Sequence, residues 1–323
     1  MRSFLPCTVA SVILSLTLLV VGLGLLTLAA DRLVLSASRV STAFGLSPIL
    51  VGALVIGLGT SAPEMLVSAL AAGRGEIDLA MGNVVGSNTA NLTLVLGSTA
   101  LVTPIVSRLR TVHREGALML LSMVAFCFLL WNLELSRVES GGLLVAMIVA
   151  VVMLILWANT DRRAGRAPQA SDEEEWKGSI RPEVWFGIGA LAFTLLGADL
   201  LVRGASDLAD DLGISSAFVG LVIVSIGTSL PELATALAAA RRGQTDMVLG
   251  NVLGSNLFNT LAVAGVAGLV GSGLADETFH NAMVVMVIAG AVAGFFAITG
   301  RRLDRWEGAM LLVLFLVFIT VAV

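Results

Sequence analysis

The chain has 323 residues, of which 57% are hydrophobic and only 13% are charged. An ordinary soluble domain carries roughly 25% charged residues, so this composition excludes a water-soluble globular protein and predicts one that crosses a membrane several times. The formal net charge of −4 gives no indication of nucleic acid as a partner, because in a membrane protein the position of the cations matters more than their sum.

Ten apolar stretches are predicted, each long enough for the roughly 20 residues that cross a bilayer. We separated them at charge clusters and at Gly, Pro and Asn turns. They cover residues 8–29, 48–72, 78–103, 115–132, 139–158, 184–203, 215–240, 246–271, 280–300 and 306–323. This pattern predicts an all-α integral membrane protein with ten transmembrane helices.

The longest polar interruption runs from Asp161 to Glu183 and holds eleven charges in 23 residues. A segment this rich in charge is typical of a solvated linker. It divides the chain into a first five-helix half at residues 1–157, a cytoplasmic linker at 158–183 and a second five-helix half at 184–323.

The cations predict the orientation in the membrane. When the loops are placed alternately on two sides, 15 of the 19 Lys and Arg residues fall on one side. Such an excess marks the cytoplasmic side. We therefore expect a multi-pass protein of the cell inner membrane with both termini on the extracytoplasmic side.

An internal repeat relates the two halves. A shift of 168 residues aligns residues 30–97 with 198–265 without a gap, with about 29 identical pairs among the 68. GTSAPE matches GTSLPE, and GNVVGSN matches GNVLGSN. Because each half holds five spans, an odd number, the second half is expected to lie upside down relative to the first. Inverted repeats of this kind form many secondary transporters.

Two acids indicate the chemistry. Glu64 is the single charge between Val40 and Gly73, and Glu232 is the single charge between Leu212 and Ala240. A charged side chain at this depth costs at least ~2.5 to 3.5 kcal/mol, so such residues usually face a partner, a cavity or an ion. Neither span contains an arginine or lysine as a partner. We expect the two acids to share a bound cation, or to hold protons when it is absent.

The residues around the acids supply oxygen atoms, which hard cations such as Ca²⁺ take as ligands. Pro63 and Pro231 should open the helix at Gly59 and Gly227 and free inward carbonyls. The hydroxyl and amide candidates come in repeat-related pairs: Thr60 with Thr228, Ser61 with Ser229, Ser87 with Ser255 and Asn91 with Asn259. For Asn83, Asn88, Asn251 and Asn256, ion binding and plain interhelical hydrogen bonding remain equally open.

The paired motifs GTSAPE with GNVVGSNTAN and GTSLPE with GNVLGSNLFN resemble the two alpha-repeats of the cation/calcium exchanger superfamily, most closely its prokaryotic sodium/calcium exchanger branch. The resemblance covers essentially the whole chain. It implies an antiporter in which Na⁺ and Ca²⁺ occupy overlapping sites between the halves, bound by the acids, hydroxyls and amides named above. It also implies that the backbone carbonyls of Gly57 and Ser225 can bind ions.

One departure from the family pattern concerns charge. Some members carry Asp where this chain has Asn259, whereas here both repeats carry a neutral amide. The site then has a charge of −2, which one Ca²⁺ or two Na⁺ neutralise equally.

The expected function is therefore exchange of Na⁺ for Ca²⁺ by alternating access, without a cofactor and without an obligate protein partner beyond the lipid bilayer. A Ca²⁺/H⁺ antiporter would use the same acids with protons as the counter-ion. A calcium channel would conduct without a counter-ion and needs no inverted repeat. An intramembrane enzyme would need a nucleophile with a base, and no histidine occurs in these motifs, so we expect a transporter.

Overall fold

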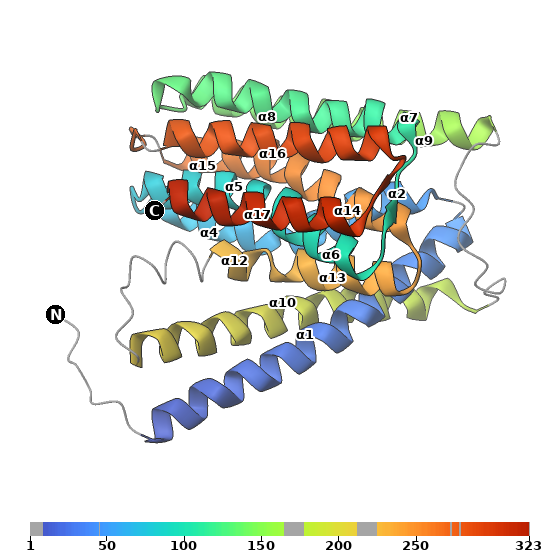
Figure 1. Cartoon of the computed structure of the whole chain (residues 1–323), viewed down its shortest axis with the longest axis horizontal. Helices are drawn as coiled ribbons and strands as arrows, with labels where there is room; N and C mark the ends of the chain where they lie inside the picture. The colour runs from blue at the N-terminus through green and yellow to red at the C-terminus, as the bar shows by residue number, and fades with distance from the viewer. Residues whose placement is uncertain are drawn as a thin grey trace.

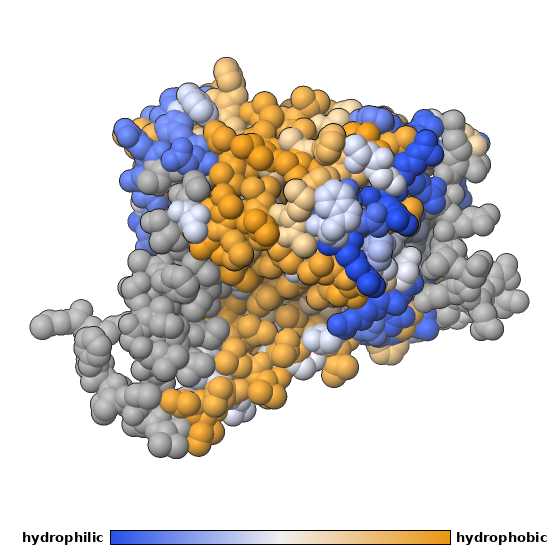
Figure 2. Space-filling view, in the orientation of Figure 1, coloured by the Kyte–Doolittle hydropathy of each residue, from blue (hydrophilic) through white to orange (hydrophobic). Residues whose placement is uncertain are grey.

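The structure is a computed structural model, and it describes residues 9–44, 46–164, 178–211, 225–271, 273–277 and 279–322. It is an all-α membrane fold with one short ribbon of two strands, β1 (Ile105–Val106) and β2 (Arg302–Leu303), paired antiparallel. Within these ranges six helices are long and apolar enough to cross a membrane, and a seventh span results if the bent pair Pro48–Thr60 and Ala62–Gly73 is taken as one. Figure 2 shows a broad hydrophobic band across the middle of one face, with hydrophilic residues toward the ends.

In the first half, three π-helices continue directly into the α-helical segments before and after them. The elements in chain order are α1 (Val9–Phe44), α2 (Pro48–Val51), the π-helix η1 (Gly52–Gly57), α3 (Leu58–Thr60), α4 (Ala62–Gly73), α5 (Ile77–Ala90), the π-helix η2 (Asn91–Val95), α6 (Leu96–Val102), α7 (Leu109–Thr111), the π-helix η3 (Val112–Gly116), α8 (Ala117–Leu129), the 3₁₀-helix η4 (Leu130–Asn132) and α9 (Arg137–Arg163).

The second half contains the same series of elements around its motifs. Its elements are α10 (Ile180–Asp211), α12 (Ser225–Thr228), α13 (Leu230–Arg241), α14 (Thr245–Phe258), the π-helix η6 (Asn259–Val263), α15 (Ala264–Val270), α16 (Phe279–Thr299) and α17 (Arg305–Ala322). The bounds of α4, α5, η2 and α6 recur 168 residues later in α13, α14, η6 and α15. The turns also match, because Gly75 and Gly243 both have a positive φ, of 78° and 70°.

The two longest helices, α1 and α10, lie beside each other at one edge of the molecule (Figure 1). They run antiparallel, since Gly22 meets Leu201 whereas Ser36 meets Gly187. A Cβ on Gly197 would lie 2.5 Å from the backbone nitrogen of Leu26. The glycines therefore allow the two backbones to approach closely, as in membrane helix pairs with small residues at the interface.

Both helices are longer than the stretches 8–29 and 184–203 that the sequence predicted. No proline interrupts α1 between residues 9 and 44, and its charges are paired instead of solvated in a loop. Arg32 and Arg39 both reach Glu183 of α10, at 2.9 and 3.2 Å. Asp31 pairs with Arg242 at the end of α13, at 2.7 Å.

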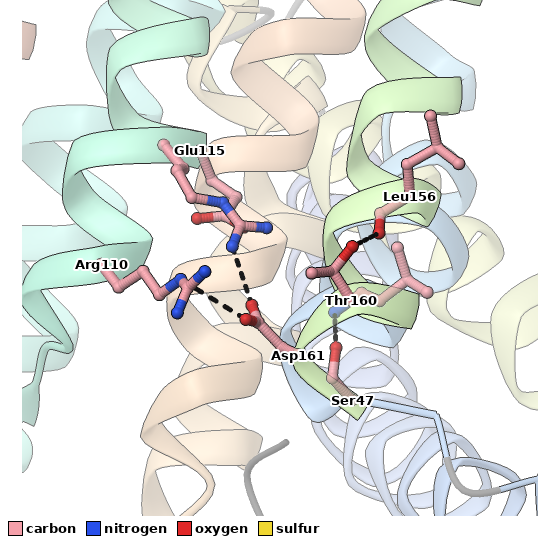
Figure 3. Close-up of polar contacts among 8 residues, drawn as sticks. Ser47, Arg110, Glu115, Leu156, Thr160 and Asp161 are labelled. Atoms are coloured by element: carbon pink, nitrogen blue, oxygen red, sulfur yellow. Dashed lines mark hydrogen bonds and ion pairs between the residues drawn. The ribbon is translucent and has the colours of Figure 1, made fainter. Parts of the chain in front are cut away.

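Charged pairs also extend α9 into the predicted linker. Asp161 accepts a 2.9 Å hydrogen bond from Arg114 and lies 3.4 Å from Arg110, so the end of α9 is held against α7 and η3 (Figure 3). The guanidinium of Arg114 stacks over Trp157 at 4.6 Å. Helices α9 and α10 thus leave residues 164–179 between them, within the predicted linker 158–183. Its acidic run at 172–175 lies outside the described residues.

Helix η1 packs tightly on α14. A Cβ on Gly52 would lie 2.5 Å from the carbonyl oxygen of Met247, and one on Gly254 would lie 2.4 Å from the Cα of Ala53. The backbones touch because the facing residues are small. This contact places the first motif beside the second, although they are some 200 residues apart in the chain.

Candidate cation site

Both predicted acids are fully buried and begin a helix. Glu64 lies in the first turn of α4 and Glu232 in the first turn of α13, each with 0% exposure. Each follows a proline in that first turn, where the missing N–H removes no helical hydrogen bond. The carboxylates are close enough to interact electrostatically.

The helix break lies two residues later than the sequence predicted. The break residues are Ser61 (φ −82°, ψ 11°) and Ser229 (φ −87°, ψ 2°), whereas Gly59 and Gly227 are still helical. In the first half the two helix segments meet at an angle of 42°. The proline starts a new helix instead of unwinding the old one, so each serine hydroxyl lies at a helix junction.

A hydrogen bond joins the two motifs. Ser61 Oγ donates to Glu232 Oε1 at 2.8 Å, and the hydroxyls of Thr60 and Ser255 also interact with that carboxylate. Ser255 Oγ donates to the carbonyl of Gly57 at 3.2 Å. Three of the predicted hydroxyls are therefore brought together around Glu232, and Ser255 also bonds to the Gly57 carbonyl that the resemblance implied.

The carboxylate of Glu64 has fewer hydrogen bonds than that of Glu232. The hydroxyl of Thr228 donates to Asn83 Oδ1 at 3.3 Å. Neither carboxylate oxygen of Glu64 accepts a hydrogen bond from a described residue, and the same is true of Glu232 Oε2 and Ser229 Oγ. Buried polar atoms without partners are rare in native proteins, and each requires an explanation such as an ion that it binds.

The predicted amides begin the two matching π-helices. Asn91 starts η2 and Asn259 starts η6, both with 0% exposure. The oxygen and the nitrogen of each amide have no hydrogen-bond partner among the described residues. Single-turn π-helices are often found at functional sites, and two identical unpartnered amides at repeat-related positions indicate a ligand shared by both halves.

The structure shows fewer side-chain contacts for the remaining predicted residues. Ser87 is fully buried and lies 3.5 Å from Asn83 Oδ1. Ser225 begins α12, and its side chain lies outside the described part of the structure. Among the described residues, no hydrogen bond joins Asn91 or Asn259 to either carboxylate.

Two asparagines that the sequence left open hold the broken helices in place. Asn83 Nδ2 donates to the backbone carbonyl of Glu64 at 3.1 Å, and Asn251 Nδ2 donates to that of Glu232 at 3.2 Å. Asn88 and Asn256 instead bond to carbonyls of their own helices. The repeat pairing of Asn83 and Asn251 was visible in the sequence, but their partners depend on how α4 packs against α5 and α13 against α14.

The electrostatics of this site favour a cation. Burying a carboxylate is costly unless it is paired or binds a metal. The buried residues of the described ranges include Glu64 and Glu232 but neither an arginine nor a lysine. Carboxylate, hydroxyl, amide and carbonyl oxygens are the ligand types that Ca²⁺ takes, so the arrangement can bind and release a hard cation.

Comparison with known proteins gives one consistent result. A family model described as sodium/calcium exchanger protein matches residues 14–156 and 183–323. The inner membrane protein YrbG of Escherichia coli (strain K12) is 37% identical, covering 83% of this chain and 84% of YrbG. The sodium/calcium exchanger MaX1 of Methanosarcina acetivorans is 29% identical, covering 94% and 97%.

Solved structures agree with these matches. A structure of the sodium-calcium exchanger NCX_Mj soaked with Na⁺ and Sr²⁺ has a TM-score of 0.83 and 31% identity, covering 96% of this chain and 98% of that one. Relatives with lower identity include a Ca²⁺/H⁺ antiporter of Synechocystis sp., at 25% identity over 78% of this chain and 77% of that protein.

Proposed function

Because the chain belongs to the sodium/calcium exchanger protein family, we propose that it is a secondary active antiporter that exchanges Na⁺ for Ca²⁺ across the inner membrane. The observation that carries the proposal is the pair of fully buried glutamates, Glu64 and Glu232, with three carboxylate oxygens that have no hydrogen-bond partner in the described ranges. The ligands are the acids and their repeat-related neighbours: Thr60, Ser61, Ser87, Asn91, Thr228, Ser229, Ser255 and Asn259, with the carbonyls of Gly57 and Ser225.

Charge arithmetic makes the exchange obligatory. Two carboxylates give the empty site a charge of −2, which either one Ca²⁺ or two Na⁺ neutralise. A doubly charged empty site resists occlusion, because the desolvation of unpaired charges is costly. The loaded site can cross the occluded state, so ions move in one direction only when others return.

The architecture proposed for this cycle is ten spans in two inverted halves, residues 1–157 and 184–323, with the cytoplasmic linker 158–183 between them. The support is the identical spacing of the four matched elements in each half and the antiparallel contact of α1 with α10. In transporters built from inverted repeats, one part rocks or slides past the other around a fixed site at the middle of the membrane. Five spans in each half give an even total, so both termini lie on the same side of the membrane. That side is the extracytoplasmic one, because the arginine-rich loops lie on the other.

A Ca²⁺/H⁺ antiporter is the second candidate, since relatives of this chain include proteins of that name. The same two carboxylates would then release Ca²⁺ on taking up two protons. The neutral amides at 91 and 259 cannot take part in such a step, because an amide does not gain or lose a proton near neutral pH.

A flux experiment separates the two functions. The purified protein is reconstituted into sealed vesicles loaded with Na⁺, with K⁺, or with acidic buffer, and entry of radioactive Ca²⁺ is followed. We expect rapid Ca²⁺ entry into the Na⁺-loaded vesicles and only background Ca²⁺ entry into the K⁺-loaded ones. Entry driven by the proton gradient alone, with no effect of Na⁺, would establish the second candidate.

Matched variants test the site in the same vesicles. Glu64→Gln and Glu232→Gln should each abolish Na⁺-driven Ca²⁺ entry, because one remaining charge cannot balance a divalent cation. Glu76→Gln is the control: Glu76 is exposed, and its repeat mate is already a glutamine, Gln244. Normal entry in both site variants would refute the site.

A further inference from the structure

An apolar crevice of about 380 Å³ lies between η3–α8 and α16, and none of the candidate cation ligands lines it. Small residues on both walls create it, including Gly116, Ala117, Gly290 and Gly294. A Cβ built on Gly294 would meet no atom within 4 Å. The void therefore results from missing side-chain volume on two facing helices, and its size is within the range of ligand pockets.

The crevice opens to the outside of the protein at membrane depth. Its lining residues Phe295 and Ile298 are 62% and 40% exposed, and both walls belong to membrane-spanning helices, at 109–132 and 279–299. Water does not fill apolar cavities that lack polar partners. Hydrocarbon is therefore the medium that can enter from the bilayer.

One end of the crevice is polar, and the positively charged residue Arg301 lies next to it in the structure. The lining there includes Ser107, Thr111 and the exposed His113, and Ser107 donates its backbone N–H to the carbonyl of Arg301 at 2.9 Å. The exposed side chain of Arg301 has no hydrogen bond or ion pair with a described residue. In contrast, its neighbours Arg108 and Arg302 pair with Asp246 and Asp304.

We propose that this crevice binds an anionic phospholipid, with one acyl chain between α8 and α16 and the phosphate at Arg301 and His113. The apolar walls select a chain, and the charge of Arg301, which has no ion pair among the described residues, selects a negative headgroup over a neutral one. An arginine near a membrane surface favours an anionic lipid by about fivefold.

The bound chain would support the helices that carry the cation site. Leu92 and Val252 line the inner wall of the crevice. Leu92 follows Asn91 in η2, and Val252 lies one turn before Ser255 in α14. The lipid site does not depend on which ions are exchanged. A negative result for lipid binding would therefore leave the proposed function unaffected, and the reverse is also true.

Native mass spectrometry of the detergent-solubilised, delipidated protein tests the site. Phosphatidylglycerol and phosphatidylcholine with identical chains are added in equal amounts, and the retained lipid is counted. We expect about a fivefold preference for phosphatidylglycerol. Arg301→Gln should remove the preference but leave chain binding, whereas Arg137→Gln, an exposed arginine on α9, should keep it.

Filling the crevice provides the second arm. Gly294→Leu should lower retention of both lipids, while Gly142→Leu, at a glycine on α9 that also meets nothing within 4 Å, should leave retention unchanged. Thermal unfolding confirms that both variants fold. Equal retention of the two lipids by the unmodified protein, or undiminished retention in Gly294→Leu, would overturn the proposal.

Discussion

Ser61 donates a 2.8 Å hydrogen bond to Glu232, a residue 171 positions away in the other half of the chain. The repeat-related pair, Ser229 and Glu64, makes no such bond: within the described ranges Ser229 Oγ and both Glu64 oxygens lack hydrogen-bond partners. The two halves therefore have similar elements but different hydrogen bonding. A transporter that alternates between two faces must be asymmetric in this way in each end state.

The Ser61–Glu232 bond predicts a binding defect. Ser61→Ala removes a hydrogen bond to a charged group, worth roughly 1.5 kcal/mol or more, so the Ca²⁺ concentration for half-maximal uptake should rise about tenfold. Uptake by the reconstituted protein at varied Ca²⁺ measures this. Ser61→Thr keeps the hydroxyl and should restore most of the affinity; equal defects in both variants would argue against the bond.

A third acid at the site should make Ca²⁺ uptake depend on pH with a sign opposite to that of the unmodified protein. Asn259→Asp makes the site charge −3, which one Ca²⁺ leaves at −1, so the loaded site crosses the membrane poorly until a proton binds. Ca²⁺ uptake by this variant should therefore increase as the pH falls toward the range in which the new carboxyl is protonated. In the unmodified protein, protons only compete with Ca²⁺ for Glu64 and Glu232, and uptake should decrease.

Asn251 should act through Glu232 as a positioning residue. Asn251→Ala removes one donor to the buried Glu232 carbonyl, which also accepts from Thr235 Oγ1 at 3.1 Å, and the loss of one hydrogen bond costs about 0.5–1.5 kcal/mol. We expect a lower Tm and a weaker apparent affinity for Ca²⁺. Asn256→Ala removes a bond that stays within one helix and should lower Tm without changing the affinity, so an unchanged affinity in Asn251→Ala would exclude the positioning role.

The ion pair between Asp31 and Arg242 links α1 to the turn after α13. Because Asp31 is half-exposed, the pair contributes little to stability, about 0–1 kcal/mol. Arg242→Asp should leave Tm nearly unchanged but alter the transport rate by up to about fivefold, if α1 moves relative to α13. The exchanged pair, Asp31→Arg with Arg242→Asp, should recover the rate; no recovery would indicate that the contact is incidental.

Close packing of η1 on α14 predicts a strong effect of added volume. Gly254→Val would force a side chain into the backbone of Ala53, and such overpacking costs typically about 1–3 kcal/mol. The thermal unfolding midpoint should fall clearly. Gly141→Val, where a Cβ meets nothing within 4 Å, is the matched control and should change it much less.

Composition and the shift of 168 residues were enough to predict an all-α membrane protein and to select Glu64 and Glu232, because a lone charge in an apolar stretch is costly wherever the chain folds. The repeat also identified Asn91 and Asn259, since a polar residue retained twice in apolar surroundings indicates a shared role.

Tertiary structure decided what depends on contacts between distant segments. The Ser61–Glu232 bond, the role of Asn83 and Asn251, and the length of α1 were not predictable. Helix α1 continues past its apolar stretch because Glu183, far along the chain, neutralises Arg32 and Arg39. Local sequence determines where a helix is favourable and which residues are costly to bury. Only the packed chain determines which residue pairs with the buried group and so offsets that cost.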